Sequence, residues 1–398
     1  TTPGTFSTYT SAGNYATGLL YKTIATDENG TQVVAFKDKN GRVILKKVQL
    51  TASDAGTGSG YAGWLSTYYI YDDIGNLRAV IQPNGVATLD GSGWSLTSTI
   101  LAEQFFRYEY DGRNRLYMKQ VPGAAPVYIV SDIEDKPVMM QDGNMRAANN
   151  WLVTVYDGLD RPIQTRMYST ATPFATLIAN ASASASYPGQ VGTLLTQTHY
   201  DDYAGVPSGL SGTLSSAGGW SGQFPATSNT AFPYPQMPVQ NTATKGLVTW
   251  TQAAVVDSTP AAYTYRVNIY DDKDRVIQTQ ATNISGGLDV VTTEYTWTGQ
   301  PYWIAESHQK SGANPLTTTI WTQNNYDHAG RITSALQRFN TNATWDTMSI
   351  MMYDAIGQLE KKLLGQRRSA VNTYTATPLE TQDYQYNSRG WLLGMNRA

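Results

Sequence analysis

Three histidines and three adjacent pairs of aspartates are the side chains in this sequence best suited to acid–base or metal chemistry. The histidines lie far apart, at His199, His308 and His328, and the first and last flank the strings THYDD and YDHAGR. These strings are typical of turns, so we expect turn or surface roles for the histidines and not catalysis. The aspartate pairs are Asp72-Asp73, Asp201-Asp202 and Asp271-Asp272.

The aspartate pairs allow two interpretations. Adjacent carboxylates could bind Ca²⁺, or they could act as a general acid and base. Calcium-binding loops bring several oxygen ligands together at a D-x-D-x-D-G spacing, which these strings lack. We therefore expect the first Asp of each pair to bond to the backbone of a turn and the second to face solvent.

Other local signatures of catalysis are missing from the sequence. It contains no G-x-S-x-G, H-E-x-x-H, Walker A or dinucleotide-binding string, and its cysteine count is 0. We predict a non-enzymatic protein with no catalytic residue, no cofactor site and no metal site. The competing hypothesis of a glycan-acting enzyme would require two carboxylates about 5–10 Å apart in a deep cleft.

The composition favours a large, nearly all-β protein. The 398 residues are 41% hydrophobic and 15% charged, and Tyr numbers 27 against 8 Phe. Tyr, Thr, Ser and Gly suit pleated strands and tight turns, whereas long helical stretches are lacking. The net charge of −3 argues against a nucleic-acid-binding surface. No apolar run reaches the ~18 residues of a transmembrane helix, and the opening TTPGTFSTYT does not resemble a signal peptide.

A short string recurs along the chain: an aromatic residue, Asp, two variable residues, a turn residue, often Arg, and an apolar residue. Repetition makes the pattern specific, because one such string alone would be weak. Full copies begin at Tyr71, Tyr110, Tyr156, Tyr270, Tyr326 and Tyr353. Weaker copies begin at Phe36, Ser131, Tyr200, Tyr295 and Tyr386.

The physical chemistry of the repeated string is that of a hairpin turn. Its second position carries a carboxylate that can accept backbone N–H bonds, as Asp72, Asp111, Asp157, Asp271, Asp327 and Asp354 do in the full copies. Three positions later, ten of the eleven copies carry Gly, Asn or Asp, which tolerate a left-handed backbone and include Gly75, Gly330 and Gly357. The exception, Ala204, is followed at once by Gly205.

The sequence on either side of each turn alternates as strands do, so each repeat is predicted to be a strand, a tight turn and a returning strand. The turn positions are 21 to 70 residues apart, too uneven for propeller blades. We expect hairpins added side by side in one structural domain. Its parts would be an N-terminal segment (1–35), a first repeat array (36–170), a Gly/Ser/Pro-rich excursion with one degenerate repeat (171–238) and a second array (239–398).

The repeated strings resemble the YD repeat of RHS-type proteins, from about Phe36 to Trp391. This family includes bacterial RHS polymorphic toxins, the B and C components of insecticidal toxin complexes, and teneurins. The resemblance implies a continuous twisted or spiralling antiparallel sheet that forms an open or partly closed shell. It implies a secreted or cell-surface location, and as partners an encapsulated toxin polypeptide or the rest of a shell. Since the chain ends at Ala398 with no toxin domain after the repeats, it implies a shell segment or a freestanding repeat module.

Aromatic residues carry the alternative hypothesis of an adhesion module that binds glycans or a cell-surface partner. We expect the periodic tyrosines to pack between neighbouring strands, and the recurring Arg42, Arg115, Arg161, Arg275 and Arg331 to cover a Tyr ring or pair with a turn Asp. Aromatic residues outside the repeat are the better ligand-binding candidates, above all the two in the excursion. These candidates are Trp220, Tyr234, Trp64, Trp94 and Trp303.

Overall fold

The computed structural model describes residues 2–10, 13–51, 60–258, 262–342, 344–365, 368–370, 373–374 and 377–396. Its contacts divide the chain into two compact units, Thr1–Leu195 and Thr196–Ala398. The expected boundaries at 170/171 and 238/239 stay predictions. The early part of the excursion packs on the first unit and the later part on the second.

The described residues of the first unit form eleven strands and four helices. The helices are α1 (Pro83–Gly91), α2 (Ser98–Glu103), α3 (Gly143–Ala147) and α4 (Phe174–Ala181). The strands are β1 (Tyr21–Thr26), β2 (Gln32–Lys37), β3 (Val43–Gln49), β4 (Trp64–Tyr71), β5 (Leu77–Ile81), β6 (Phe105–Tyr110), β7 (Leu116–Gln120), β8 (Val127–Ser131), β9 (Pro137–Gln141), β10 (Asn150–Tyr156) and β11 (Pro162–Ser169).

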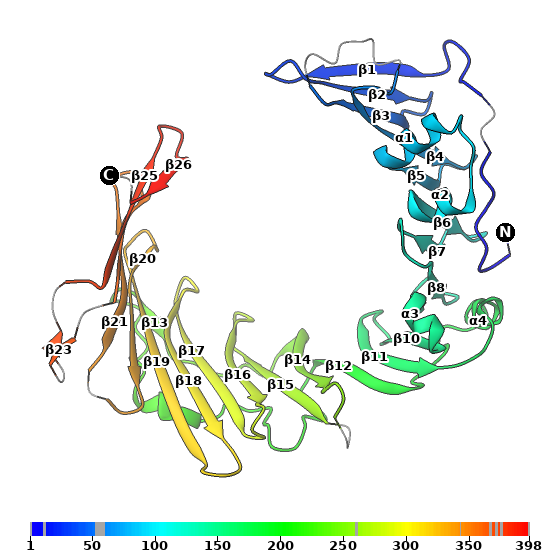
Figure 1. The fold of residues 1–398 in the computed structure, drawn as a ribbon. Coiled ribbons are helices and arrows are strands. Elements are labelled where there is room, and N and C mark those ends of the chain that lie inside the picture. Colours follow the sequence, from blue (N-terminus) through cyan, green and yellow to red (C-terminus); the bar gives the residue numbers. More distant parts are fainter. Residues whose placement is uncertain are drawn as a thin grey trace. The chain divides into compact units, whose positions relative to one another are not determined.

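Each strand of the first unit pairs antiparallel with the strand before it and the strand after it, from β1 to β11. The short helices lie in the longer connections, where local signals start them. Pro83 opens α1, and the Thr97 and Asp142 side chains cap α2 and α3 by accepting backbone N–H bonds. Figure 1 shows α1 and α2 beside β4 to β6.

Two apolar clusters hold α1, α2 and α4 on the sheet of the first unit. Leu89 of α1 packs with Ile81 and Phe105, which come from neighbouring strands. Leu177 of α4 packs with Val130 and Trp151. The excursion therefore begins with an amphipathic helix whose apolar side completes the core of the first unit.

The second unit contains most of β12, which begins just before the division, and all later elements. A 3₁₀ segment, η1, covers Ala217–Gly222. The strands are β12 (Thr193–Asp201), β13 (Pro235–Gln236), β14 (Thr244–Ala254), β15 (Tyr263–Tyr270), β16 (Val276–Thr282), β17 (Leu288–Thr296), β18 (Pro301–Lys310), β19 (Leu316–Tyr326), β20 (Ile332–Phe339), β21 (Asp346–Tyr353), β22 (Leu359–Leu364), β23 (Arg368–Ala370), β24 (Thr373–Tyr374), β25 (Glu380–Tyr386) and β26 (Leu392–Met395).

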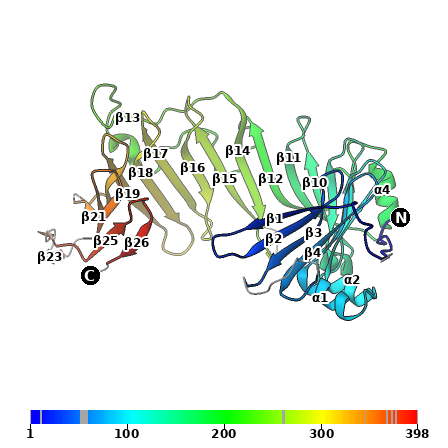
Figure 2. The ribbon, with the colours of Figure 1, turned by 90° about the horizontal axis from the view of Figure 1, so that it is seen from above.

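The sheet of the second unit is also antiparallel. β12 pairs with β14, and successive neighbours then pair up to β22, which pairs with β25, and β25 with β26. Figure 2 shows β14 to β18 running side by side. β13 pairs with the end of β17, and β23 with β24.

Residues 203–240 lie across one face of the second sheet. Tyr203 and Leu210 pack against Val267 and Ile269 of β15. Farther along, η1 contacts β17 and β18, and Trp220 and Phe224 pack with Trp321. The excursion is therefore an ordered cover for apolar strand residues, which would otherwise face water.

The prediction of a mostly β, antiparallel, open fold is confirmed in each unit. In the residues that the structure describes, helix is confined to the short elements given above. Among the described strands, β1 pairs only with β2 and β26 only with β25, so neither sheet closes through these strands.

Candidate functional site: the turn edge of the repeats

The turn at Asp327 shows how a repeated string folds. The Asp327 N–H donates to the Arg331 carbonyl at 2.9 Å, and the Gly330 N–H donates to the Asp327 carbonyl at 2.9 Å. Asp327 Oδ1 accepts the N–H groups of Ala329 and Arg331, each at 2.9 Å. The bonds from the Arg331 backbone and side chain lower the pKa of the Asp327 carboxyl. Gly330 has φ = +79°, as the left-handed position of this turn requires.

The same pair of backbone bonds forms in ten of the eleven repeats, all except the degenerate one. The residue three after the turn position has a positive φ in each of these ten, including the non-glycine residues Asn114, Asp135, Asp160 and Asp274. The hairpin register shifts at the residue before each turn position, which is the signature of a bulge.

The repeat at Tyr200 departs from this geometry. Here Asp201 itself has φ = +73°, and its Oδ1 accepts the N–H of Gly246 on β14 at 2.7 Å. Asp202 instead caps the local bend, because its Oδ1 accepts the Ala204 N–H at 2.8 Å. Ala204 stands where the regular turns carry Gly, Asn or Asp, and here the chain continues into the long excursion.

The basic residue four positions after the turn position links one hairpin to the next. Arg331 pairs with Asp327 of its own turn at 2.7 Å, and its guanidinium lies 4.5 Å from the centre of the Tyr353 ring in the following repeat. Arg275 likewise pairs with Asp271 and covers Tyr295. The other such arginines, Arg42, Arg115 and Arg161, pair with Asp38, Asp111 and Asp157.

The tyrosine before the turn position completes this link. Tyr353 donates its hydroxyl to the carbonyl of Ile332 in the preceding repeat at 2.9 Å. Tyr326 makes the equivalent bond to Pro301 at 2.8 Å. Tyr295 bonds in the same way to Val276, and Tyr156 to Pro137. Each of these tyrosines reaches the carbonyl five positions after the preceding turn position, so one contact repeats along the edge.

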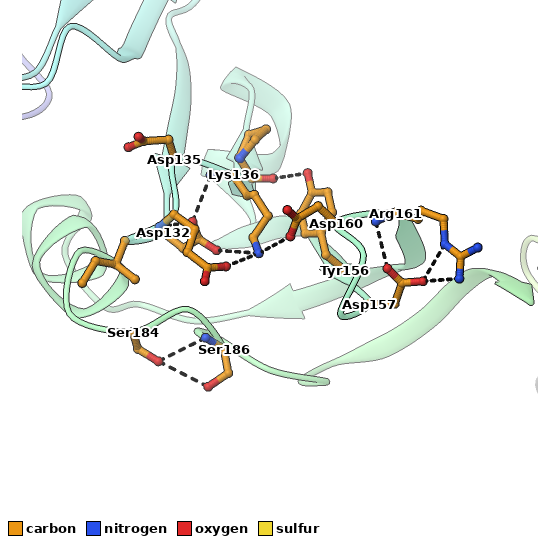
Figure 3. A network of polar contacts seen from close by, with 12 residues as sticks. Asp132, Asp135, Lys136, Tyr156, Asp157, Asp160, Arg161, Ser184 and Ser186 are labelled. Atoms are coloured by element: carbon orange, nitrogen blue, oxygen red, sulfur yellow. Dashed lines mark hydrogen bonds and ion pairs between the residues drawn. The ribbon is translucent and has the colours of Figure 1, made fainter. Parts of the chain in front are cut away.

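Figure 3 shows this edge in the first unit. Lys136 takes the place of arginine in its repeat, and its Nζ lies 2.8 Å from Asp160 in the next turn. The same ammonium group contacts Glu134 and lies 5.8 Å from the centre of the Tyr156 ring. A lysine therefore supplies the same inter-repeat contact as the arginines do. We call these Tyr, Asp and Arg or Lys contacts between neighbouring turns the turn ladder.

Two further turns of this kind were not predicted from the sequence. Asp27 and Asn283 each stand three residues before a glycine, Gly30 and Gly286, and each forms the same pair of backbone bonds. Both lack the preceding aromatic residue on which the pattern was defined. A search for Asp or Asn with Gly three positions later, with no requirement for a preceding aromatic residue, would have identified both turns.

The structure places four of the five ligand-binding candidates in packed clusters. Trp64 is buried beneath the Lys47 ammonium group, and Trp220 is buried with its indole N–H bonded to the Ser215 carbonyl at 2.7 Å. Trp94 packs edge-on against Tyr68, and Trp303 packs edge-on against Trp345. Tyr234 differs, because 38% of it is exposed and its ring stands edge-on to the exposed Phe232.

The three histidines occupy separate environments. His199 stacks on Trp250 with ring centres 5.1 Å apart, and the exposed His328 lies against Phe232 at 4.4 Å. His308 pairs with Asp289 at 2.6 Å in a cavity of about 250 Å³, which Glu306 also lines. In the described ranges, no three His, Cys, Asp or Glu side chains gather as metal ligands would. Likewise, no described helix combines the length and apolarity that crossing a bilayer demands.

Two buried glutamates were also not anticipated. Glu109 and Glu294 stand two residues before a turn position, where Val130 and Ile269 are buried in other repeats. Alternation alone cannot find them, since it predicts an apolar residue at this position. The signal in the sequence is an acidic residue at a position that most other repeats fill with an apolar one.

The turn ladder and the open antiparallel sheets define a repeat protein built from β-hairpins. The chain resembles the crystal structure of TcdB2-TccC3-Cdc42, with 13% identity and a TM-score of 0.39 over 94% of this chain and 18% of that one. It resembles the Tc holotoxin pore of Photorhabdus luminescens, with 12% identity and a TM-score of 0.38 over 93% and 17%. It also resembles the crystal structure of TcdB2-TccC3, with 12% identity and a TM-score of 0.39 over 94% of this chain and 18% of that one. The chain thus spans less than a fifth of these chains. No family model and no curated protein sequence matches it.

Proposed function

We propose that this chain is a non-enzymatic wall segment of an RHS-type β-shell, which contributes to enclosing a toxin polypeptide or to a secreted bacterial scaffold. The observation that carries the proposal is the turn ladder. A hairpin presents its tyrosine to the previous hairpin and its arginine to the next, so further hairpins can be added at either side. In the turns that carry both Asp and Arg, the carboxylate bonds to its own turn backbone and to the arginine, which is a structural use and not an acid–base one.

Electrostatics support a structural role for the ladder. The Asp271 and Arg275 side chains are 8% and 18% exposed, and they lie 2.6 Å apart. Arg275 also donates to the carbonyl of Thr296 in the next turn at 3.1 Å. Charge-assisted bonds of this kind fix the spacing between neighbouring hairpins. An encapsulating wall needs such regular spacing because each hairpin is marginal alone.

Protease protection in the full gene product that contains this chain tests the proposal. We expect a polypeptide enclosed by the wall to survive digestion of the native protein. It should become sensitive when the ladder is weakened by Arg275→Ala combined with Tyr295→Phe. The matched control, Asp272→Ala, alters an exposed neighbour of the ladder and should leave protection intact. If digestion of the native protein leaves no protected polypeptide apart from the wall itself, the enclosing role is contradicted.

A second candidate function, glycan binding, is favoured by one exposed aromatic group. Phe232 and Tyr234 stand edge-on to each other, and the Tyr234 carbonyl accepts the backbone N–H of Trp297 at 2.9 Å. Trp297 is 59% exposed. Lys273 covers the Trp297 ring at 3.6 Å from its centre. Aromatic faces next to polar groups suit stacking on sugars. A glycan array repeated with Tyr234→Ala tests this candidate, and binding that survives this substitution, or no binding at all, counts against it.

A further inference from the structure

The N-terminal segment lies on the first unit as an extended ligand would. Residues 6–10 belong to no strand, and Phe6, Ser7 and Tyr9 are half-buried while Thr8 is exposed. Residues 13–19, which follow, are exposed. The segment is therefore held on the sheet mainly by three side chains.

The buried carboxylate of Glu109 binds Ser7, at the centre of this segment. The Ser7 N–H donates to Glu109 Oε1 at 2.5 Å, and the Ser7 hydroxyl donates to Oε2 at 3.1 Å. Arg78 pairs with the same carboxylate and donates to Ser7 Oγ at 2.5 Å. Glu109 is 0% exposed, so both of its oxygens require partners inside the protein. Ser7 supplies two of the bonds that this burial demands.

Two aromatic side chains of the segment flank this centre. The Phe6 ring lies 4.0 Å from the Arg107 guanidinium on β6. The Tyr9 ring packs beside Phe105, and its hydroxyl donates to the Arg78 carbonyl at 3.1 Å. Burial, followed by the charge of Glu109, raises the pKa of Tyr9 to about 12, so this hydroxyl remains a donor at neutral pH.

We propose that this face of β5 and β6 is a peptide-binding site, and that residues 4–9 are its separable ligand. The site recognises an extended segment with an aromatic residue, a serine at the next position and a tyrosine two positions later. The carboxylate of Glu109 accepts hydrogen bonds from the serine N–H and hydroxyl. Arg107 covers the ring of the first aromatic residue, and the tyrosine ring packs on the apolar cluster around Phe105. This proposal does not depend on the proposed shell function.

The test begins by cutting the segment free. A protease site placed within residues 13–19 of the full chain allows cleavage in the exposed connection. We expect the N-terminal fragment to co-elute with the folded remainder in gel filtration. Separation of the fragment from a remainder that stays folded by circular dichroism would overturn the proposal, and so would unfolding on cleavage.

Synthetic peptides then test recognition without altering the protein. A labelled peptide of residues 2–10 should bind the cut protein, and unlabelled peptides should compete with it. The Ser7→Ala peptide should require at least about a tenfold higher concentration to displace half of the labelled peptide. The reason is that it lacks the hydroxyl that bonds to the charged Glu109 and Arg78 side chains. The Phe6→Ala peptide should also be weaker, whereas the Thr8→Ala peptide, changed at the exposed position, should match the original. Equal competition by the Ser7→Ala and Thr8→Ala peptides would contradict the assigned site.

Discussion

Glu109 and Glu294 hold the same position in their repeats, two residues before the turn position, and both are fully buried. Glu109 accepts bonds from Ser7 and pairs with Arg78. Neither carboxylate oxygen of Glu294 has a hydrogen-bond partner in the part of the chain that the structure describes. Burial raises the pKa of Glu294 to about 8 from its ordinary value of 4.5.

The raised pKa predicts that Glu294 weakens the fold as the pH rises. Between pH 4.5 and about 8, the folded state keeps a proton that the unfolded state has released. The free energy of unfolding therefore falls through this range and levels off above it. Glu294→Gln should remove this dependence and be more stable than the original protein at pH 8.5, but not at pH 4. Urea unfolding at several pH values measures the difference, and a gap that does not widen with pH would contradict the prediction.

Glu109→Gln provides the matched comparison at the same position of the repeat. It removes the charge that pairs with the mostly buried Arg78, so we expect a loss of about 2–4 kcal/mol at pH 7. The two substitutions should thus change stability in opposite directions at pH 8.5. If both substitutions change the free energy of unfolding in the same direction, the hydrogen-bond and ion-pair partners of the glutamate do not decide its effect on stability at this position.

The aspartate pair Asp271-Asp272, in the repeat that begins at Tyr270, separates structural from solvated carboxylates. Asp271 accepts the N–H groups of Lys273 and Arg275, each at 2.9 Å, whereas Asp272 is exposed. Asp271→Ala should lower the free energy of unfolding by about 2–4 kcal/mol, because it leaves Arg275 and two turn N–H groups without this carboxylate. Asp272→Ala should change it by less than about 0.5 kcal/mol. Chemical denaturation of the two variants provides the measurement, and equal losses would argue against the turn role.

The left-handed turn position predicts a strong effect at Gly330. Gly330→Val forces a β-branched residue into φ = +79° and brings a Cβ within 2.5 Å of the Gln300 side-chain amide. We expect a cost of about 1–3 kcal/mol in the free energy of unfolding. Gly158→Val is the control, because Gly158 has open space and Ile133 fills the same turn position in another repeat. Similar thermal melts for both variants would remove the special role of Gly330. Gly58→Val, in the Gly/Ser loop that begins at Gly56, is also expected to cost far less than Gly330→Val, and Gly58 lies outside the described residues.

The turns could be predicted from the sequence because their chemistry is local. Asp327, Gly330 and Arg331 are close together in the chain, and their backbone and side-chain bonds form within five residues. The strands on both sides follow from alternation. The expected antiparallel sheet therefore required no knowledge of distant contacts.

The covering segments could not be predicted in the same way. Ser7 and Glu109 are 102 residues apart, and no local pattern pairs them. Trp220 lies in a Gly/Ser-rich stretch that predicts a free loop, yet its ring packs with Phe224 and the strand residue Trp321. Composition indicates that a segment is irregular, but the apolar surface left open on a distant sheet decides whether that segment is buried.

The last hairpin provides a test of how far each repeat stands alone. β25 pairs with β22 through Lys361 to Leu364, and β26 pairs with β25 only, among the described strands. Deleting residues from Thr381 onward removes this hairpin almost entirely and exposes the edge of β22. Because repeats contact mainly their neighbours, we expect the shortened chain to remain folded. Its new edge should increase association between molecules, since unpaired backbone groups can pair with another chain. Circular dichroism, thermal melts and light scattering measure both effects. Global unfolding of the shortened chain would instead show that the hairpin is part of one closed cooperative fold.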